Sequence, residues 1–183
     1  MIPTALAPQI EGIASIQSTA DEFLHAFDRR VQAGLLTGHA HPRSNYRAFQ
    51  VGPGQLHVSA VTWWTAINVG LNELDLQVSA PGSVHYRVWY WRWARFVLAL
   101  SGSLGVIGLV LIQIFDVRHY IANHPGTMIP GLSLDQNLQV AWSLVVFWGF
   151  VAPWLIIATH KRPLRRLVAR LIGEVDRSAS TLK

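Results

Sequence analysis

Two long stretches without a charged residue constrain this chain more than any other feature. Residues 96–115 read FVLALSGSLGVIGLVLIQIF, and residues 138–159 read LQVAWSLVVFWGFVAPWLIIAT. A helix of about 20 residues, rising about 1.5 Å per residue, crosses the roughly 30 Å hydrocarbon core of a bilayer. Composition agrees, because only 14% of the 183 residues are charged, whereas soluble chains carry about 25%. The sequence therefore predicts two transmembrane helices.

An aromatic and basic stretch, RVWYWRW, leads directly into the first apolar segment. Trp and Tyr rings favour the headgroup level, where an apolar body and a polar N–H or O–H are both accommodated, and arginine reaches the lipid phosphates from there. The predicted interfacial anchor consists of Trp89, Tyr90, Trp91, Arg92, Trp93 and Arg95. The alternative is a β-strand that turns the rings of Trp89, Trp91 and Trp93 to one side for a partner.

Basic residues gather on one side of the predicted hairpin. Those before the first segment are Arg87, Arg92 and Arg95, and those after the second are Lys161, Arg162, Arg165, Arg166 and Arg170. The loop over residues 116–137 carries Arg118 beside Asp116 and Asp135. This asymmetry predicts a multi-pass membrane protein with both termini cytoplasmic. The second basic group is predicted to lie on anionic lipid, which accounts for the net charge of +5 without nucleic acid.

The residues before the membrane have a different character. Apolar side chains at helical spacing predict an amphipathic helix over residues 8–34. They are Ile13, Ile16, Ala20, Phe23, Leu24, Phe27 and Val31, with Gly34 and Gly38 as places for the helix to stop. The periodicity then changes to two, which predicts strands over residues 46–51, 56–61, 74–78 and 84–88. Residues 63–72 fit a strand or a helix.

A further amphipathic helix is predicted after the second span. Pro163 can begin it, and its apolar stripe consists of Leu164, Leu167, Val168, Leu171, Ile172 and Val175. That stripe suits either a membrane surface or the sheet.

The second span itself carries two local signals. Ser133 and Gln136 resemble a capping box that begins it, and Pro153 predicts a bend within it.

The predicted fold class is an α+β membrane protein in three parts. Residues 1–93 form a cytoplasmic domain with an N-terminal amphipathic helix and a small antiparallel sheet. Residues 94–160 form a two-helix transmembrane hairpin with an outer loop at 116–137. Residues 161–183 form a cytoplasmic amphipathic helix and tail.

Catalytic and metal-binding patterns are weak. Neither apolar segment contains Asp, Glu, Lys, Arg or His, as a pump or ion carrier would need, and the chain has no cysteine. Asp116, His119 and His124 lack a fourth ligand and are interpreted as solvated loop residues, and His39 and His41 as part of a polar linker. We therefore expect no enzyme and no dedicated cofactor ligand, with room for peripheral contact with pigments or lipids of neighbouring subunits.

Small residues in the spans indicate helix packing, because they let a second helix backbone approach closely. A tryptophan near mid-span, Trp148, lies away from the headgroup belt, and the sequence predicts that protein or a cofactor buries it. The predicted packing residues are Ser101, Gly102, Gly105, Gly108, Trp148 and Gly149.

The segments FDVRHYIANHPGTMIPGLSLDQNLQVAWSLVVFWGFVAPWLIIATHKRPLRRLVARLIGEVD and WWTAINVGLNELDLQVSAPGSVHYRVWYWRW resemble a group of uncharacterised bacterial two-span membrane proteins. The whole chain is similar to an accessory, non-pigment subunit of a bacterial reaction centre and light-harvesting supercomplex. That resemblance implies a structural subunit with other integral membrane subunits and lipids as partners. The alternative hypothesis is a membrane-tethered cytoplasmic binding module that recognises a lipid, a ligand or a soluble protein.

Overall fold

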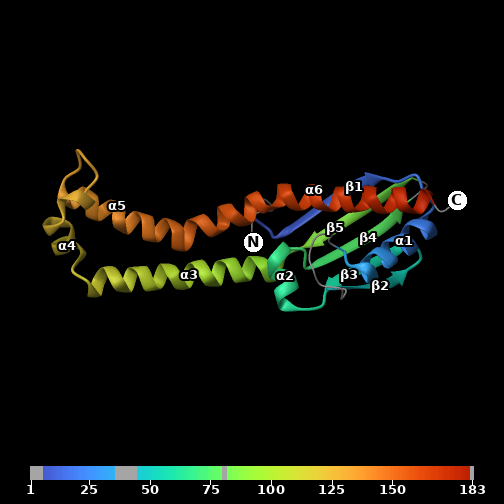
Figure 1. Cartoon of the computed structure of the whole chain (residues 1–183), viewed down its shortest axis with the longest axis horizontal. Coiled ribbons are helices and arrows are strands. Elements are labelled where there is room, and N and C mark those ends of the chain that lie inside the picture. Colours follow the sequence, from blue (N-terminus) through green and yellow to red (C-terminus); the bar gives the residue numbers. More distant parts are fainter. Residues whose placement is uncertain (1–5, 36–44, 80–81, 182–183) are drawn as a thin grey trace. The chain divides into compact units, whose positions relative to one another are not determined.

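The computed structural model describes residues 6–35, 45–79 and 82–181, and the chain forms two compact units. Unit 1 consists of Met1–Arg95 together with Ala158–Lys183, and unit 2 consists of Phe96–Ile157. Unit 1 holds a sheet with its covering helices, and unit 2 holds apolar helices (Figure 1). The predicted α+β fold with a small antiparallel sheet is confirmed.

The sheet of unit 1 has five antiparallel strands in the order β1-β5-β4-β3-β2. Their bounds are β1 (Gln9–Ser15), β2 (Tyr46–Gly52), β3 (Gln55–Ala60), β4 (Glu73–Ser79) and β5 (Ser83–Trp89). The four strands that the alternating pattern predicts are all present. The ambiguous stretch between β3 and β4 is a helix, α2 (Trp63–Val69), which ends where Gly70 adopts a left-handed φ of 75°.

The N-terminal segment corrects the sequence prediction, because the expected helix over residues 8–34 is a strand followed by a helix. β1 pairs with β5 along its whole length, and α1 (Ala20–Ala33) begins at a capping box between Thr19 and Glu22. Within β1, Ile10 is buried while Ile13 is 66% exposed, as alternation requires. Gly12 is needed there, since a Cβ would collide with the Tyr86 side chain. Gly34 ends α1 as expected, and Gly38 lies outside the described residues.

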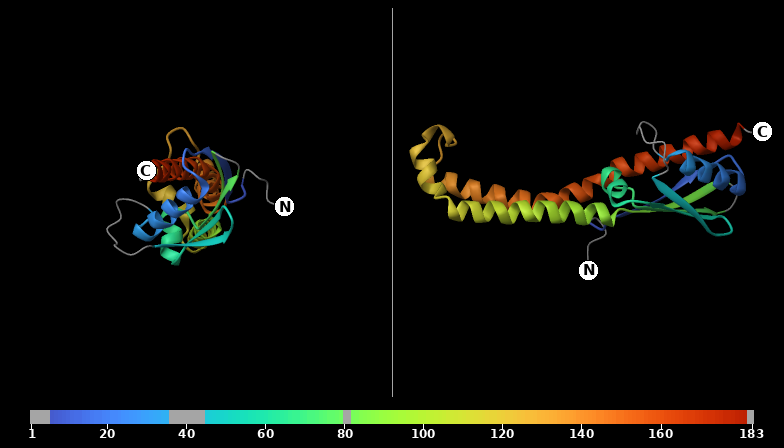
Figure 2. Two further views of the ribbon diagram at one scale, coloured as in Figure 1. Left: turned by 90° about the vertical axis from the view of Figure 1, so that its right-hand side faces the viewer. Right: turned by 60° about the horizontal axis from the view of Figure 1, so that its bottom comes forward.

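Two helices cover one face of the sheet. α1 and the C-terminal part of α6 (Ala152–Ser180) lie on the same side of the strands (Figure 2). Their apolar residues meet the inward residues of the strands in one core, of which Phe23, Phe27, Val58, Leu74, Leu76, Val84, Val88, Leu164, Val168 and Ile172 are members. The apolar stripe after the second span is therefore buried against the sheet, which decides between the two surfaces that the sequence left open.

A buried carboxylate ties α6 to the connection between β1 and α1. Asp176 accepts hydrogen bonds from the backbone N–H groups of Gln17 and Ser18, each at 3.0 Å, and from the Ser18 hydroxyl at 2.6 Å. Burial alone would raise the pKa of Asp176, but these hydrogen bonds outweigh it and hold the pKa below its ordinary value. The contact joins residues more than 150 positions apart in the sequence.

Unit 2 contains the two apolar segments. α3 (Trp91–Ile114) and the continuous helix Leu134–Ser180 are long and apolar enough to cross a membrane. The latter comprises α5 (Leu134–Val146), the π-turn η2 (Phe147–Val151) and α6. Between the two lie α4 (Val117–Asn123) and the short turn η1 (Pro125–Thr127). The predicted Ser133–Gln136 capping box begins α5.

The two prolines of the long helix act differently from each other. Before Pro153 the chain takes a π-turn, in which the N–H of Ala152 donates to the carbonyl of Phe147 five residues earlier, and the predicted bend stays a prediction. Pro163 does not begin a new helix, as the sequence suggested, but lies inside α6. The helix continues through the one hydrogen bond that proline cannot donate, with His160 stacked on Trp93 before Pro163 and Leu164 buried in the core after it.

Candidate binding face

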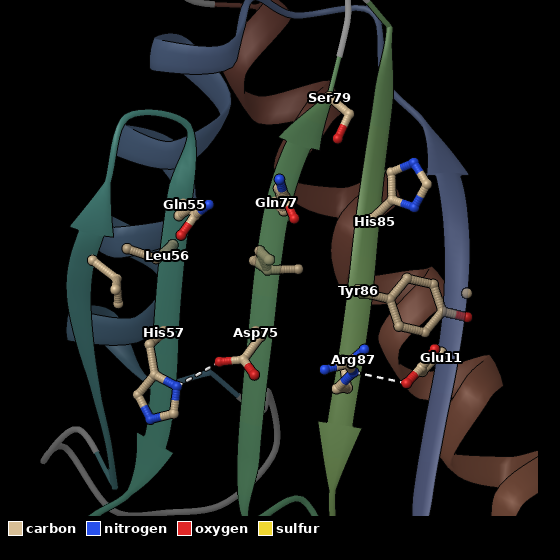
Figure 3. Close-up of a pocket in the computed structure, with 13 residues that line it drawn as sticks. Glu11, Gln55, Leu56, His57, Asp75, Gln77, Ser79, His85, Tyr86 and Arg87 are labelled. Carbon is tan, nitrogen blue, oxygen red and sulfur yellow. Dashed lines mark hydrogen bonds and ion pairs between the residues drawn. The ribbon is translucent and has the colours of Figure 1, made fainter.

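The second face of the sheet carries no helix within the part of the chain that the structure describes. Figure 3 views the strands from this side, with helices behind them. A broad depression of about 580 Å³ lies over β1, β5, β4 and β3. We call this surface the open face. It is lined mainly by polar side chains that alternate along each strand with the core residues.

A row of charged residues crosses the open face from strand to strand. The register places Glu11 opposite Arg87, Arg87 opposite Asp75, and Asp75 opposite His57. Two close pairs result, with Arg87 Nε 2.7 Å from Glu11 Oε1 and His57 Nδ1 2.6 Å from Asp75 Oδ1 (Figure 3). We call these four residues the charged row. Acidic and basic groups alternate along it, which favours the sheet and presents both signs of charge to a partner.

Neutral polar groups and a few apolar residues surround the charged row. In the neighbouring row, His85 pairs with Gln77, and Gln77 pairs with Gln55. Exposed apolar residues lie on the two edge strands: Ile13 of β1 is 66% exposed, and Phe49 and Val51 of β2 are 50% and 68% exposed. The open face thus combines a polar centre with apolar edges, an arrangement that suits contact with a partner of mixed character.

The pairing of His57 with Asp75 is the arrangement that orients an imidazole for acid–base chemistry. A nucleophilic hydroxyl or thiol would have to contact the other ring nitrogen of His57, and the hydrogen bonds of the described residues include no such group. The same residues contain no group of three or more His, Cys, Asp or Glu side chains able to hold a metal. The groups that the open face presents are acidic, basic and amide side chains that can form ion pairs and hydrogen bonds with a partner.

The loop residues considered as metal ligands have local roles. Asp116 caps α4 by accepting the backbone N–H of His119 at 2.9 Å, and the ring of His124 stacks on Tyr120 with centroids 4.4 Å apart. His39 and His41 lie outside the described residues.

A cluster of rings, which we call the junction, lies where unit 1 continues into both apolar segments. Trp93, in the first turn of α3, stacks on His160 of α6 with centroids 4.1 Å apart and planes 20° from parallel. The ring of Tyr90 meets both edge-on. Gly70 makes room for His160, since a Cβ there would collide with its imidazole. Asn72, buried beside them, accepts the N–H groups of Arg92 and Trp93.

The predicted interfacial anchor divides between three environments. Trp89 ends β5, where Arg87 lies 5.9 Å from its ring, and Arg95 lies 5.9 Å from the ring of Trp91 in α3. The prediction is wrong for Tyr90, because its ring is fully buried and burial raises its pKa to about 12. Strand and helix meet within this stretch, so neither the anchor nor the alternative strand describes all of it.

Some of the predicted packing residues lie where the two helices of unit 2 meet, and others are exposed. A Cβ built on Gly105 would lie 2.8 Å from the Cα of Gly149, and one on Gly108 would lie 2.9 Å from Val145, so the two helices of unit 2 approach each other there. Gly102 faces open space, and Trp148 is 61% exposed. Ser101, Gly108 and Trp148 line an apolar groove of about 390 Å³ beside the Gly105–Gly149 contact.

The basic group after the second span lies on the outer side of α6. Arg162, Arg165, Arg166 and Arg170 are exposed, and Lys161 is half-buried. Their availability to anionic lipid stays a prediction.

Sequence reasoning did not identify the open face, although one signal was present. Polar residues alternate with apolar ones in ELDLQVS and SVHYRVW. Only the register, which depends on pairing between distant strands, puts Glu11, Arg87, Asp75 and His57 in one row. No protein-family model, no curated protein and no solved structure matches the chain.

Proposed function

We propose that this chain is a non-catalytic, membrane-anchored binding protein. The two apolar helices hold it in a bacterial inner membrane with both termini in the cytoplasm, and the open face binds a polar segment of another protein. The charged row carries this proposal, because it presents alternating acidic and basic side chains across four strands, a width of about 15 Å at roughly 4.8 Å per strand. A broad, shallow surface of this kind suits a protein segment better than an enclosed small molecule.

The proposal is tested by cross-linking in native membranes followed by a charge exchange. A photoreactive residue at Gln77, on the open face, should capture one partner, and the same residue at Gln32, on the exposed side of α1, should not. The double variant Glu11→Arg, Arg87→Glu keeps an ion pair between β1 and β5 with its charges reversed and sets a carboxylate opposite Asp75. Once circular dichroism shows that it has the wild-type fold, it should lose the cross-link. Undiminished cross-linking by the double variant would contradict the proposal.

A second candidate is an accessory structural subunit of a multi-subunit membrane complex. The apolar groove in unit 2 favours it, since Leu104, Leu144 and Trp148 offer exposed apolar surface beside small residues that admit another transmembrane helix. Gly105 and Gly149 already contact each other, so the docking surface would be the groove and not the glycines themselves. The photosynthetic supercomplex stays a prediction from the resemblance.

Gentle solubilisation of native membranes, purification through a tag after Lys183, and an absorption spectrum with mass spectrometry separate the candidates. Bacteriochlorophyll bands together with reaction-centre and antenna polypeptides would support the supercomplex. A colourless preparation that contains one partner, retained by the wild type and lost with the charge exchange, would support the binding protein.

A further inference from the structure

Two neighbouring tryptophans of α2 are exposed and take no part in the sites described above. Trp63 is 48% exposed and Trp64 is 69% exposed, and Val61 just before them is 42% exposed. An indole can bury about 150–250 Å² of surface, so two in water forgo a large hydrophobic contribution. An adjacent pair of this kind indicates a surface that another medium or molecule covers.

One buried side chain, Asn72, joins α2 to the first turn of α3 within unit 1. The Asn72 amide donates to the carbonyl of Ala66 in α2 at 3.0 Å, and its oxygen accepts the N–H of Arg92 in α3 at 2.8 Å. Arg92 also reaches back to the carbonyl of Ala60, just before α2, at 3.5 Å. Figure 1 shows α2 beside the start of α3. The tryptophans are therefore held next to the first turn of a helix whose uncharged stretch begins at Phe96.

We infer that Trp63 and Trp64 form a membrane contact at the level of the lipid headgroups. This inference depends on the proposed function, because it requires residues 96–115 to lie in a bilayer. The headgroup region then begins within about one helical turn of Arg92. Asn72 holds α2 beside this residue. Indoles favour that region because their ring is apolar and their N–H can bond to water or phosphate.

A lipid surface fits these residues better than a protein partner does. Asn72 and Arg92 hold α2 at the first turn of α3, the helix that carries the first apolar segment, and Arg92 and Arg95 in that turn supply the cations that lipid phosphates attract. The contact would give unit 1 an attachment to the membrane besides the two chain connections at Arg95 and Ala158, and so limit its rotation about them.

The absence of cysteine makes a depth measurement direct. Trp64→Cys, labelled with an environment-sensitive fluorophore, is reconstituted as the full chain in vesicles of three parts phosphatidylcholine to one part phosphatidylglycerol. A nitroxide-labelled lipid with its spin label near the headgroup end of the acyl chain serves as quencher. The control is Phe49→Cys, an aromatic position on the open face that is 50% exposed, and Leu104→Cys in α3 reports insertion of the span.

We expect the label at 64 to be quenched at least about twofold more than the label at 49. Equal, weak quenching at 64 and 49, with strong quenching at 104, would overturn the inference and leave the proposed anchoring intact. Weak quenching at 104 would show that the span is not in the bilayer, and the proposed function would fail with the inference.

A second experiment compares the chain that has both tryptophans with a variant that lacks them. With the label at Thr65, replacement of both Trp63 and Trp64 by Ser should reduce quenching by at least about twofold, because the apolar contact is removed. Phe49→Ser with the same label should leave it unchanged. Both changes are at exposed positions, so the fold is retained. Unchanged quenching in the double variant would also overturn the inference.

Discussion

The two faces of the five-stranded sheet come from alternating residues of the same strands, yet they have opposite surroundings. In β4, Leu74 and Leu76 are almost fully buried beneath α1 and α6, while Asp75 and Gln77 point to the open face. The apolar sides of two helices make the difference, because they meet only one face. The comparison teaches that the stability of unit 1 resides on the covered face and its recognition chemistry on the other, so substitutions should separate the two.

The largest difference in stability should separate substitutions at two neighbouring residues of β4, one on each face of the sheet. Leu76→Ala removes a fully buried side chain from the core and should lower the free energy of unfolding by about 2–5 kcal/mol. Gln77→Ala changes an exposed residue of the open face and should stay within about 0.5 kcal/mol. Chemical unfolding of the full chain in detergent micelles measures both. Equal costs would mean that the open face is buried by something in the protein itself.

The next largest effect should come from the packing of Gly70 against His160 at the junction. Gly70→Ala places a side chain at a φ of 75° and against the His160 imidazole, which should cost about 2–4 kcal/mol. Glycine at 54, in the β2–β3 turn with a φ of 71°, gives the matched control, because a Cβ there meets only a backbone oxygen at 3.3 Å. Gly54→Ala should therefore destabilise the chain less than Gly70→Ala in the same unfolding experiment, and the reverse order would contradict the packing at the junction.

The third effect on stability should come from the hydrogen bonds of Asp176, near the C-terminal end of α6, on the covered face of the sheet. Asp176→Asn weakens the charge-assisted hydrogen bonds from Gln17 and Ser18 and should cost about 1–3 kcal/mol at neutral pH. Hydrogen exchange of the Ser18 amide, which should accelerate in the variant, reports the contact directly. Ser178→Ala, an exposed change in α6 whose hydroxyl donates to the carbonyl of Glu174 and not to Asp176, serves as control.

The pH dependence of the same contact has a definite sign. Because the folded protein holds the pKa of Asp176 below its ordinary value, the carboxylate contributes stability above the unfolded pKa of about 4, and that contribution is lost as the pH falls through the folded pKa. The difference in stability between the wild type and Asp176→Asn should therefore be largest near neutral pH and shrink in acid. A difference that grows on acidification would be inconsistent with the lowered pKa.

The smallest effect on stability should come from the open face. Arg87→Ala removes an ion pair in which both side chains are about half exposed, so solvent screens it and the cost should be about 0.2–1 kcal/mol. The same variant should weaken partner cross-linking at position 77 strongly. A large loss of stability with unchanged cross-linking would invert the comparison between the two faces.

Local patterns predicted much of this fold. The alternation in residues 46–51, 56–61, 74–78 and 84–88 and the Ser133–Gln136 capping box are present as expected. The helix predicted over residues 8–34 begins only at Ala20, because Ile13 and Ile16 happen to continue the helical spacing of the apolar residues in α1, whereas pairing with β5 makes residues 9–15 a strand and leaves Ile13 exposed. The prediction that Tyr90 belongs to the interfacial anchor was wrong. An aromatic ring beside an apolar segment is typical of such an anchor, but contacts with Trp93 and His160 bury this one.

What the sequence by itself determined is the set of elements whose cause is local: two helical segments without charged residues that are long enough to cross a membrane, and strands that alternate between polar and apolar residues. The tertiary structure alone decided which surface covers the apolar stripe of α6, that this helix runs through Pro163, and that Glu11, Arg87, Asp75 and His57 form one row. The physical reason is that periodicity records which side of an element is apolar, while the partner of that side depends on contacts between residues far apart in the chain.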